Sequence, residues 1–282
     1  MERTVTLDKT PLTLIGRRQA AGAPAPNFHV VSPDLKPMTL EDAGDRVKLI
    51  SFFLSLDTPV CDIQVRELNR RAAAHPEVTT LGISKDLPFA QKRFAETFNL
   101  TAIHLNSDYQ SSSFGINYGV LIRENGLLAR GVVIIDRSNV IRYTQLVREV
   151  TNQPDYEEVE EKLAEVLENP SSGPATGTAY RCIPCESGTP PLPPERVRTL
   201  LPGAPGWEPV DGRKLVRTFT FRTFARAKEF LDVLSVIAEE QGHHPSFTLT
   251  YNRLKVTLTT HASGGLTDND FTMARIIEQA VA

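Results

Sequence analysis

The 282-residue sequence is poor in cysteine, and its three cysteines are an odd number. That count argues against the disulfide framework of a small secreted protein and leaves thiols free for other chemistry. The sequence also lacks an apolar run near the roughly 20 residues that a membrane-spanning helix needs. Its first residues lack the charged-then-apolar order of a signal peptide. Together these absences predict a cytoplasmic protein that does not enter a membrane.

An excess of charge of one sign is missing as well. The net charge is −3 and no basic cluster stands out, which argues against nucleic acid as a main partner. The apolar and charged fractions are those of soluble globular proteins, so a sizeable core can form. At roughly 150 residues per domain, the length suits about two domains.

One segment has the composition of a linker. Residues 169–178 contain no large apolar side chain, which is typical of a short, semi-flexible connection. We therefore predict a first domain over 1–168 and a second over 179–282. The first ends in an amphipathic helix over Asp155–Glu168, whose apolar residues share one face.

Apolar strands alternate with amphipathic helices in the first domain. The sequence predicts strands over Lys48–Leu56 and Val78–Ser84, a helix that starts near Cys61, a helix over Asp86–Phe98 with Asp86 as its cap, and a hairpin of Gly131–Asp136 with Val140–Leu146. Strands mixed with covering helices indicate an α/β sandwich.

Cys61 is the first candidate functional residue. It follows a polar turn in which Asp57 or Thr58 can cap a helix, and Pro59 suits the first helical position. With Thr58 as the cap, Cys61 lies in the first turn, where free backbone N–H groups and the helix dipole favour a thiolate. The alternative is a buried structural cysteine without reactivity.

Four motifs of the first domain resemble the thiol peroxidase branch of the peroxiredoxins. In chain order they are LSLDTPVC, SKDLPFAQKRF, YGVLI and GLLARGVVIID, and the resemblance runs from about residue 5 to 168. It implies a thioredoxin-like fold and the reduction of hydrogen peroxide or organic hydroperoxides. It also implies that Cys61 attacks the peroxide to give a sulfenic acid, that Thr58 hydrogen-bonds the peroxide and the thiolate, and that Arg130 holds the thiolate anionic. Without the resemblance, Arg130 would be read as an exposed cation at a strand end.

Two positions depart from the family pattern. Leu54 stands where the family usually has a proline seven residues before the peroxidatic cysteine, and Ala95 stands where it usually has the resolving cysteine. The usual intramolecular disulfide therefore cannot form. Either an outside thiol such as thioredoxin reduces Cys61, or Cys182 or Cys185 resolves it, or the domain is an inactive scaffold.

Cys182 and Cys185 form a CxxC pair just after the linker. Such a pair can be a redox couple, part of a zinc site or two structural thiols. A four-cysteine zinc site is excluded because only Cys61 remains. The linker permits the pair to act as resolving thiols, since about 14 residues span at most roughly 45 Å.

The pattern of the second domain predicts an antiparallel sheet with helices packed on one face. We expect a short helix opened by Pro194, a strand from Trp207, a strand over Lys214–Arg222, a helix over Thr223–Gln241 stopped by Gly242, strands over Ser246–Tyr251 and Leu254–Thr260, and a last helix from Thr267 with Asp270 in a capping box.

Three histidines lie at the rims of this predicted sheet. His243 and His244 follow a helix, and His261 follows a strand. Imidazole titrates near neutral pH and can both give and take a proton, which favours acid–base chemistry. A three-histidine zinc site is one alternative, although adjacent side chains diverge. Surface histidines without a function are another.

The residues around these histidines resemble pterin-4a-carbinolamine dehydratase. The motif EEQGHHPSFTLTYNRLKVTLTTH followed by GGLTDND carries the likeness, as does the CIPC…GTPPL opening, over about residues 180–282. It implies the loss of water from 4a-hydroxytetrahydropterin to give the quinonoid dihydropterin, with no metal or organic cofactor. His243, His244 and His261 match the three active-site histidines of that family.

Further positions match the substrate site of the same family. Glu239 and Pro245 flank the histidine pair, and Asp270 matches an acid on the last helix. Trp207 matches a pocket-side aromatic residue, although a core position would explain it equally well. Gly242 stands where some relatives have an acidic residue.

The sequence thus predicts a two-domain, bifunctional fusion. An α/β thioredoxin-like domain would reduce hydroperoxides, and a small α+β domain would dehydrate 4a-hydroxytetrahydrobiopterin. The expected partners are hydroperoxide and pterin substrates, a thioredoxin-like reductant and further copies of the chain in a homo-oligomer, a dimer or higher. The alternative is a dehydratase-fold binding or dimerisation module attached to an inactive peroxiredoxin scaffold, because that family includes dimerisation partners of transcription factors.

Overall fold

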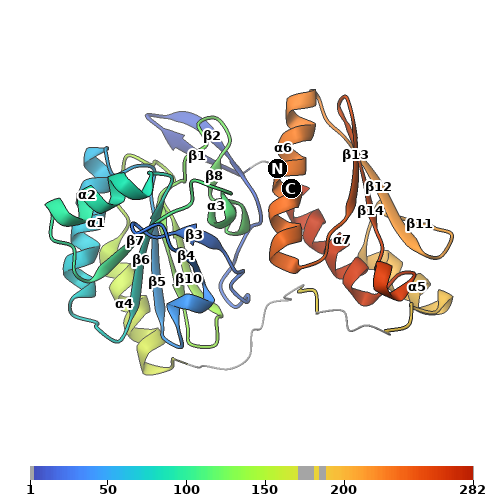
Figure 1. Cartoon of the computed structure of the whole chain (residues 1–282). Coiled ribbons are helices and arrows are strands. Elements are labelled where there is room, and N and C mark those ends of the chain that lie inside the picture. Colours follow the sequence, from blue (N-terminus) through green and yellow to red (C-terminus); the bar gives the residue numbers. More distant parts are fainter. Residues whose placement is uncertain (1–2, 171–180, 184–188, 282) are drawn as a thin grey trace. The chain divides into compact units, whose positions relative to one another are not determined.

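The computed structural model describes residues 3–170, 181–183 and 189–281. The chain divides into two compact units, Met1–Ala179 and Tyr180–Ala282, each with its own sheet and core (Figure 1). The predicted linker lies outside the described residues except for its first two. None of the described helices combines the length and the apolarity that crossing a bilayer requires.

The described part of the first unit contains a seven-stranded mixed sheet and a separate three-stranded sheet. Its elements are β1 (Arg3–Leu7), β2 (Thr10–Ile15), β3 (His29–Val31), β4 (Pro37–Thr39), η1 (Glu41–Ala43), β5 (Lys48–Phe52), α1 (Pro59–Ala72), β6 (Thr79–Ser84), α2 (Pro88–Thr97), β7 (Ile103–Ser107), α3 (Ser113–Asn117), β8 (Leu121–Ile122), β9 (Gly131–Ile135), β10 (Ile141–Leu146) and α4 (Tyr156–Glu168). The large sheet has the order β10-β9-β5-β6-β7-β3-β4, and the small one β1-β2-β8.

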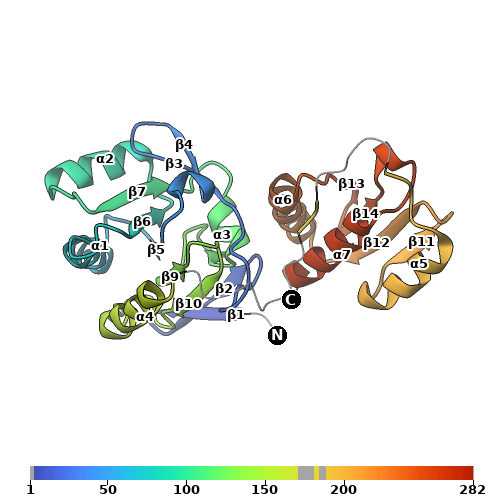
Figure 2. The same cartoon turned by 90° about the horizontal axis from the view of Figure 1, so that it is seen from below.

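β5 lies in the middle of the large sheet and is buried along its whole length. It pairs in parallel with β6 and antiparallel with β9. α1 and α4 cover one face of the sheet, and α3 lies on the other (Figures 1 and 2). A strand that is covered on both faces has apolar residues along its whole length. That continuous apolar run is the pattern from which the strand was predicted. Its carboxyl end leads through residues 53–58 into α1, and this connection carries the candidate site.

Two boundaries of the first unit differ from the prediction. The strand predicted over Lys48–Leu56 ends at Phe52, because the following residues leave the sheet to form the turn before α1. The prediction that Asp86 caps the next helix is wrong. That helix, α2, begins at Pro88 after Leu87, which makes no side-chain cap. The Asp86 carboxylate is instead bonded to residues of the turn before α1.

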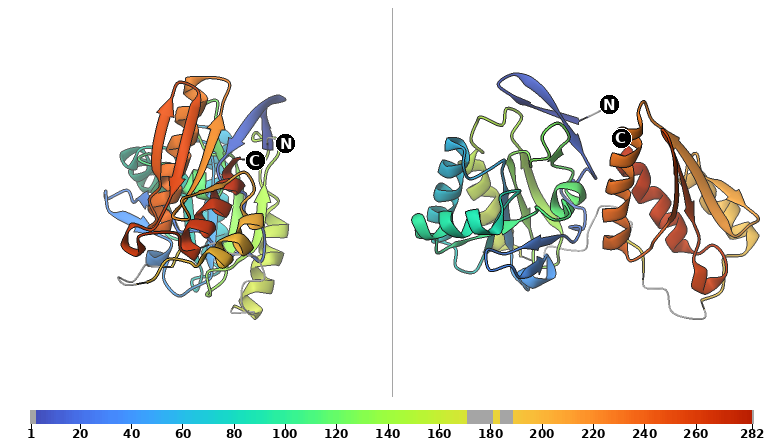
Figure 3. Two further views of the ribbon diagram at one scale, coloured as in Figure 1. Left: turned by 90° about the vertical axis from the view of Figure 1, so that its right-hand side faces the viewer. Right: turned by 45° about the horizontal axis from the view of Figure 1, so that its top comes forward.

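The second unit is a four-stranded antiparallel sheet, in the order β11-β12-β14-β13, with α6 and α7 packed on one face (Figures 1 and 3). Its described elements are α5 (Pro194–Leu200), η2 (Leu201–Gly203), β11 (Glu208–Val210), β12 (Lys214–Thr220), α6 (Phe224–Gln241), β13 (Ser246–Thr250), β14 (Arg253–Leu258), η3 (His261–Ser263) and α7 (Asp268–Val281). The predicted antiparallel sheet with helices on one face is confirmed.

The ends of α6 and the start of α7 follow the predicted chemistry. Thr223 caps α6 by accepting from the backbone N–H of Arg226, and Gly242 ends it in the left-handed region at φ 60°. Asp270 reaches back to accept from the backbone N–H of Thr267 at 2.8 Å, as a capping box requires. These two helix ends carry the residues of the second candidate site.

Candidate active sites

The turn before α1 places Cys61 at the start of a helix, as predicted. Thr58 is the N-cap, and its Oγ1 accepts from the backbone N–H of Cys61 at 3.4 Å. Pro59 occupies the first helical position, where its missing N–H leaves no bond unmade. Cys61 is 0% exposed. The first turn therefore surrounds the sulfur with positive electrostatic potential in a dry environment.

Arg130 contacts the sulfur of Cys61 directly. Its Nη2 donates to Sγ at 3.2 Å, and its Nε donates to the Val150 carbonyl at 2.8 Å. Arg130 is only 2% exposed, so the reading as an exposed strand-end cation is wrong. A charge-assisted bond in a low-dielectric interior is stronger than one in water. The arrangement stabilises negative charge on the sulfur.

Gln64 completes this buried cluster, and the sequence analysis did not identify it. Its Oε1 accepts from Arg130 Nη1, and its Nε2 donates to Ser51 Oγ at 2.8 Å. Three residues after Cys61 on α1, it lies on the same helical face as the cysteine. That spacing, together with a polar residue on an otherwise apolar face, is the signal that could have found it.

The first turn of α1 is also braced from the segment before α4. Gln153 Nε2 donates to the Val60 carbonyl at 2.8 Å, and Tyr156 OH donates to Gln153 Oε1 at 2.5 Å. Burial raises the pKa of Tyr156 above its ordinary value, so the phenol remains a neutral donor. This contact fixes the backbone beside Cys61.

Both residues that depart from the family pattern have non-polar side chains. Leu54 is buried in the connection between β5 and α1, and Ala95 is half-buried on α2. Ala95 offers no sulfur at the position of the resolving cysteine. Cys61 and Cys182 are both free thiols.

In the second unit, His243 and Asp270 form a buried pair. His243 Nε2 lies 2.9 Å from Asp270 Oδ1, and the histidine is 8% exposed. The other carboxylate oxygen of Asp270 accepts from the hydroxyl of Thr260 at 2.9 Å and from the backbone N–H of Thr267. These contacts fix both the carboxylate and the imidazole ring that it faces.

His244 turns away from its neighbour, as expected for adjacent residues. Its side chain is 60% exposed, and its Nε2 lies 3.0 Å from Glu239 Oε1. His261 is exposed in η3, just after β14. Since Ser246 pairs with Thr257, the start of β13 and the end of β14 lie at the same end of the sheet. The predicted histidines therefore gather at one rim, with Pro245 half-buried between the pair and β13.

Trp207 is a core residue of the second unit. Its ring packs edge-on against Phe219, and its Nε1 donates to Glu278 Oε1 at 3.0 Å. The core alternative therefore accounts for its position. A role in substrate binding stays a prediction.

Cys182 is anchored beside the His243–Asp270 pair. Its backbone N–H donates to Gln241 Oε1 at 2.8 Å, and its thiol faces the Asn269 carbonyl at 3.6 Å. Asn269 also exchanges two hydrogen bonds with the backbone of Ile183. Cys182 is buried, whereas Cys185 lies outside the described residues. The first half of the CxxC pair thus connects the end of α6 to the start of α7.

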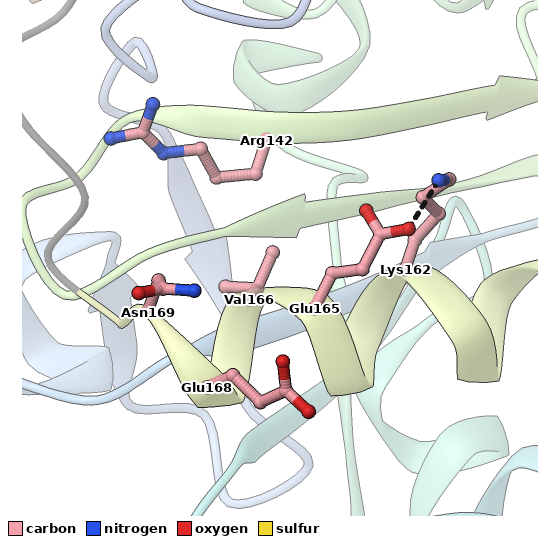
Figure 4. Close-up of a pocket in the computed structure, with 6 residues that line it drawn as sticks. All are labelled: Arg142, Lys162, Glu165, Val166, Glu168 and Asn169. Atoms are coloured by element: carbon pink, nitrogen blue, oxygen red, sulfur yellow. Dashed lines mark hydrogen bonds and ion pairs between the residues drawn. The ribbon is translucent and has the colours of Figure 1, made fainter.

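Two pockets among the described residues of the first unit are lined by none of the predicted site residues. The larger, about 420 Å³, lies between β10 and the end of α4 (Figure 4). Its cations are already paired, Arg142 with Asp136 and Lys162 with Glu165. The smaller, about 200 Å³, lies between the turn before α1 and α2, with Asp57 in its wall. Its walls also include Leu56, Phe94 and Phe98.

Within the described parts of the two units, no three histidine, cysteine or carboxylate side chains are grouped to hold a metal ion. The geometry defines two classes of site instead. The first unit has a thioredoxin-like fold with a buried cysteine against an arginine. The second has a histidine–carboxylate pair at the rim of a small antiparallel sheet.

Comparisons with known proteins assign both units. Residues 20–161 match the redoxin family model, and residues 190–280 match the model of pterin 4 alpha carbinolamine dehydratase. The chain is 45% identical over 164 residues to a thiol peroxidase from Halalkalibacterium halodurans, covering 58% of this chain and 99% of that protein. The chain therefore belongs to the redoxin family, in its thiol peroxidase branch, with a pterin carbinolamine dehydratase domain fused to it.

Two solved structures are similar to parts of this chain. The crystal structure of a peroxiredoxin-like protein from Aquifex aeolicus is 42% identical, covers 58% of this chain and 97% of its own, and superposes with a TM-score of 0.56. A transcriptional coactivator/pterin dehydratase from Brucella melitensis is 37% identical over 32% of this chain and 98% of its own, with a TM-score of 0.31. The assignment of the second unit rests on the family model.

Proposed function

We propose that this chain is a bifunctional enzyme that reduces hydroperoxides at Cys61 and dehydrates 4a-hydroxytetrahydropterins at His243, His244 and His261. For the first activity, the observation that carries the proposal is the 3.2 Å contact between Arg130 Nη2 and the buried sulfur of Cys61. For the second, it is the 2.9 Å contact between His243 and the buried Asp270.

In the proposed peroxidase reaction, the Cys61 thiolate attacks the terminal oxygen of the hydroperoxide. The O–O bond breaks, the sulfur is oxidised to sulfenic acid, and the departing oxygen leaves as water or an alcohol after taking a proton. The guanidinium of Arg130 stabilises the thiolate and the negative charge that moves onto the departing oxygen.

A dithiol reductant, such as a thioredoxin-like protein, would return the sulfenic acid to the thiol: its first thiol forms a mixed disulfide with Cys61 and releases water, and its second thiol then displaces Cys61 as a thiol and leaves the reductant as a disulfide. The burial of Cys182 and its two contacts, to Gln241 and Asn269, favour this route over resolution by Cys182. Attack by Cys182 would first require those contacts to break. Resolution by Cys185 stays a prediction of the sequence.

The test of the peroxidase is the rate of Cys61 oxidation by hydrogen peroxide in Arg130→Met. Loss of the guanidinium should slow oxidation by about 100-fold, the range in which loss of one transition-state donor falls. Arg66→Met is the matched control, because Arg66 is exposed on α1, the helix that carries Cys61, and is paired with Asp62. Equal rates in wild type and Arg130→Met would contradict the proposal.

In the proposed dehydratase reaction, His243 takes the proton from the ring N–H while an acid protonates the departing 4a-hydroxyl. With Nε2–H donated to Asp270, His243 presents the lone pair of Nδ1 as the base. His244, exposed and paired with Glu239, is assigned as the acid that converts the hydroxyl to water. His261 would hold the pterin from the opposite side of the rim. These residues need neither a metal nor an organic cofactor for this step.

The test of the dehydratase is turnover of 4a-hydroxytetrahydropterin by the full chain and by His243→Ala. Loss of the base should lower kcat by about 100-fold. Cys61→Ser is the matched control and should leave turnover unchanged. A wild-type chain without turnover that still binds a protein partner would support the alternative, a binding or dimerisation module.

A further inference from the structure

Asp86 joins the strand β6 to the turn that carries Thr58. Its Oδ1 accepts from the Ser55 hydroxyl at 2.6 Å, and its Oδ2 accepts from the backbone N–H of Leu56 at 2.8 Å. Oδ2 also accepts from the hydroxyl of Ser84, the last residue of β6, at 2.8 Å. Each bond to an ionised carboxylate is stronger than a neutral one. The carboxylate therefore holds the turn at two adjacent residues and fastens it to the sheet.

The neighbouring cation does not compete for this carboxylate. Lys85 Nζ donates to the Asp108 carbonyl at 2.6 Å and to Ser112 Oγ at 2.7 Å. Ser84 is held in turn by Gln91 Nε2, which donates to its hydroxyl at 3.1 Å. The three donors that face Asp86 are thus neutral groups whose positions are fixed by the sheet, by α2 and by the turn itself.

The turn that Asp86 holds determines the polarity of the Thr58 hydroxyl. Both the backbone N–H and the Oγ1 of Thr58 donate to the Ser55 carbonyl, at 3.1 and 3.0 Å. A hydroxyl has one hydrogen, so Thr58 presents only lone pairs toward Cys61, where it accepts from the backbone N–H. An acceptor at this place can receive the O–H of a hydroperoxide and align its O–O bond with the sulfur.

We propose that Asp86 is a positioning residue for the peroxide: by fixing Ser55 and Leu56 it holds the Ser55 carbonyl where it takes the Thr58 hydrogen, and so keeps Thr58 an acceptor. This inference rests on the proposed peroxidase function. Asp86 acts through Thr58 and does not itself reach the sulfur. Its loss should therefore impair reactions that use the acceptor and spare reactions that need only the thiolate.

Two reactions of Cys61 separate these effects in the full-length protein. Oxidation by hydrogen peroxide needs the acceptor, whereas alkylation by iodoacetamide offers no O–H group for Thr58 to receive. In Asp86→Asn, we expect oxidation to slow by about 10- to 100-fold, the size of effect that a small misplacement of a reacting group produces. Alkylation should change by less than about 3-fold, since Arg130 and the helix start remain. Asp34→Asn, on an exposed carboxylate paired with Lys92 of α2, is the control and should change neither rate.

A double-mutant cycle with Thr58→Val identifies the path of the effect. If Asp86 acts through Thr58, Asp86→Asn slows oxidation no further in a chain that already lacks the hydroxyl. Equal losses of oxidation and alkylation, or additive losses in the cycle, would overturn the inference and indicate a general loss of structure. Should Asp86→Asn fail to fold, Ser55→Ala removes only one of the three donors and is expected to slow oxidation by about 3-fold through the same path.

Measurements on the wild-type protein distinguish a failure of the positioning role from a failure of the proposed peroxidase function on which it rests. A wild-type Cys61 that is alkylated but does not react with hydrogen peroxide would overturn the proposed peroxidase and the positioning role together. A reactive wild type with an equally reactive Asp86→Asn would overturn the positioning role alone.

Discussion

The two candidate sites differ in how much of their chemistry is buried. In the first unit, the nucleophile and the cation beside it are almost completely enclosed, at 0% and 2% exposure for Cys61 and Arg130. In the second, only the His243–Asp270 pair is enclosed, while His244 and His261 face solvent. The difference in burial is consistent with the two proposed reactions. A thiolate gains most from a charge-assisted bond in a dry site, whereas a flat pterin needs acid and base groups that it can reach from outside.

Burial also determines which residues support each site. Around Cys61, Gln64 of α1 is bonded to Ser51 of β5 and to Arg130, and a glutamine from the segment before α4 is bonded to the backbone of α1. Around His243, the support comes from the strand end at Thr260 and the helix start at Thr267. The first site is thus sensitive to changes deep in its unit, and the second to changes at the rim of its sheet.

The largest expected effect is the loss of hydroperoxide reduction at the first site, with the second site unchanged. Cys61→Ser should lower hydroperoxide reduction by at least about 1000-fold, because a hydroxyl with an ordinary pKa is a far weaker nucleophile than a thiolate. Dehydration of the pterin should stay at the wild-type rate. Both are measured on one preparation of the full chain, by peroxide consumption and by pterin absorbance. A parallel fall in dehydration would show that the sites are not independent.

The reverse change breaks the second site alone. His261→Ala should lower dehydration by about 10- to 100-fold, because one of three groups that contact the pterin is lost. Peroxide reduction should be unaffected, and the comparison is a steady-state assay of both reactions. If dehydration survives unchanged, His261 is a surface histidine and the site reduces to His243 and His244.

A smaller effect is expected from removing one of the buried hydrogen bonds that support Arg130 in the first site. Gln64→Leu removes the acceptor of Arg130 Nη1 and the donor to Ser51 while keeping the volume of the side chain. Nη1 of the buried guanidinium then lacks its acceptor, although Nε and Nη2 keep theirs, so we expect Cys61 oxidation to slow by about 10-fold. Gln153→Leu, which removes the brace at Val60 without touching Arg130, is the control and should have a weaker effect.

The last expected effect is on the free energy of unfolding of the first unit and on how that free energy changes with pH. Burial raises the pKa of Asp108 to about 7, although its carboxylate accepts from the backbone N–H groups of Phe114 and Gly115. In the unfolded chain the pKa is about 3.9. The folded state therefore binds the proton more tightly, and this contribution to stability is complete below about pH 4 and is lost as the pH rises through about 7.

Asp108→Asn tests that linkage. Relative to this variant, the wild type should lose about 3 kcal/mol of unfolding free energy between pH 5 and pH 8. Because the single tryptophan, Trp207, lies in the second unit, its fluorescence follows that unit, and far-ultraviolet circular dichroism follows both. A constant difference between wild type and variant at the two pH values would contradict the raised pKa.

Much of the fold could be predicted because local patterns and tertiary packing agree. The turn at Thr58 and Pro59, the stop of α6 at Gly242 and the capping box at Asp270 all depend on a few adjacent residues. The hairpin of β1 and β2 was missed, although threonines alternate with apolar residues in its strands; its pairing with β8 comes from residues more than 100 positions away.

The positions of the candidate reacting groups were easier to predict from the sequence than the residues that hold them in place. Cys61 and the three histidines stand at helix and strand ends, where sequence patterns are informative. Gln64 and Asp86 act through partners brought together only by the folded chain. Asp86 illustrates the limit well: its place before Pro88 predicts a helix cap, but Ser55 and Leu56 offer better donors from a segment 30 residues away.

The most direct test of the two-site account is mass spectrometry of the full chain after one equivalent of hydrogen peroxide, with free thiols blocked and disulfides kept. The account predicts sulfenic acid on Cys61, an unmodified Cys182 and undiminished pterin dehydration in the same sample. An unmodified Cys61, or a loss of pterin dehydration in that sample, would contradict it.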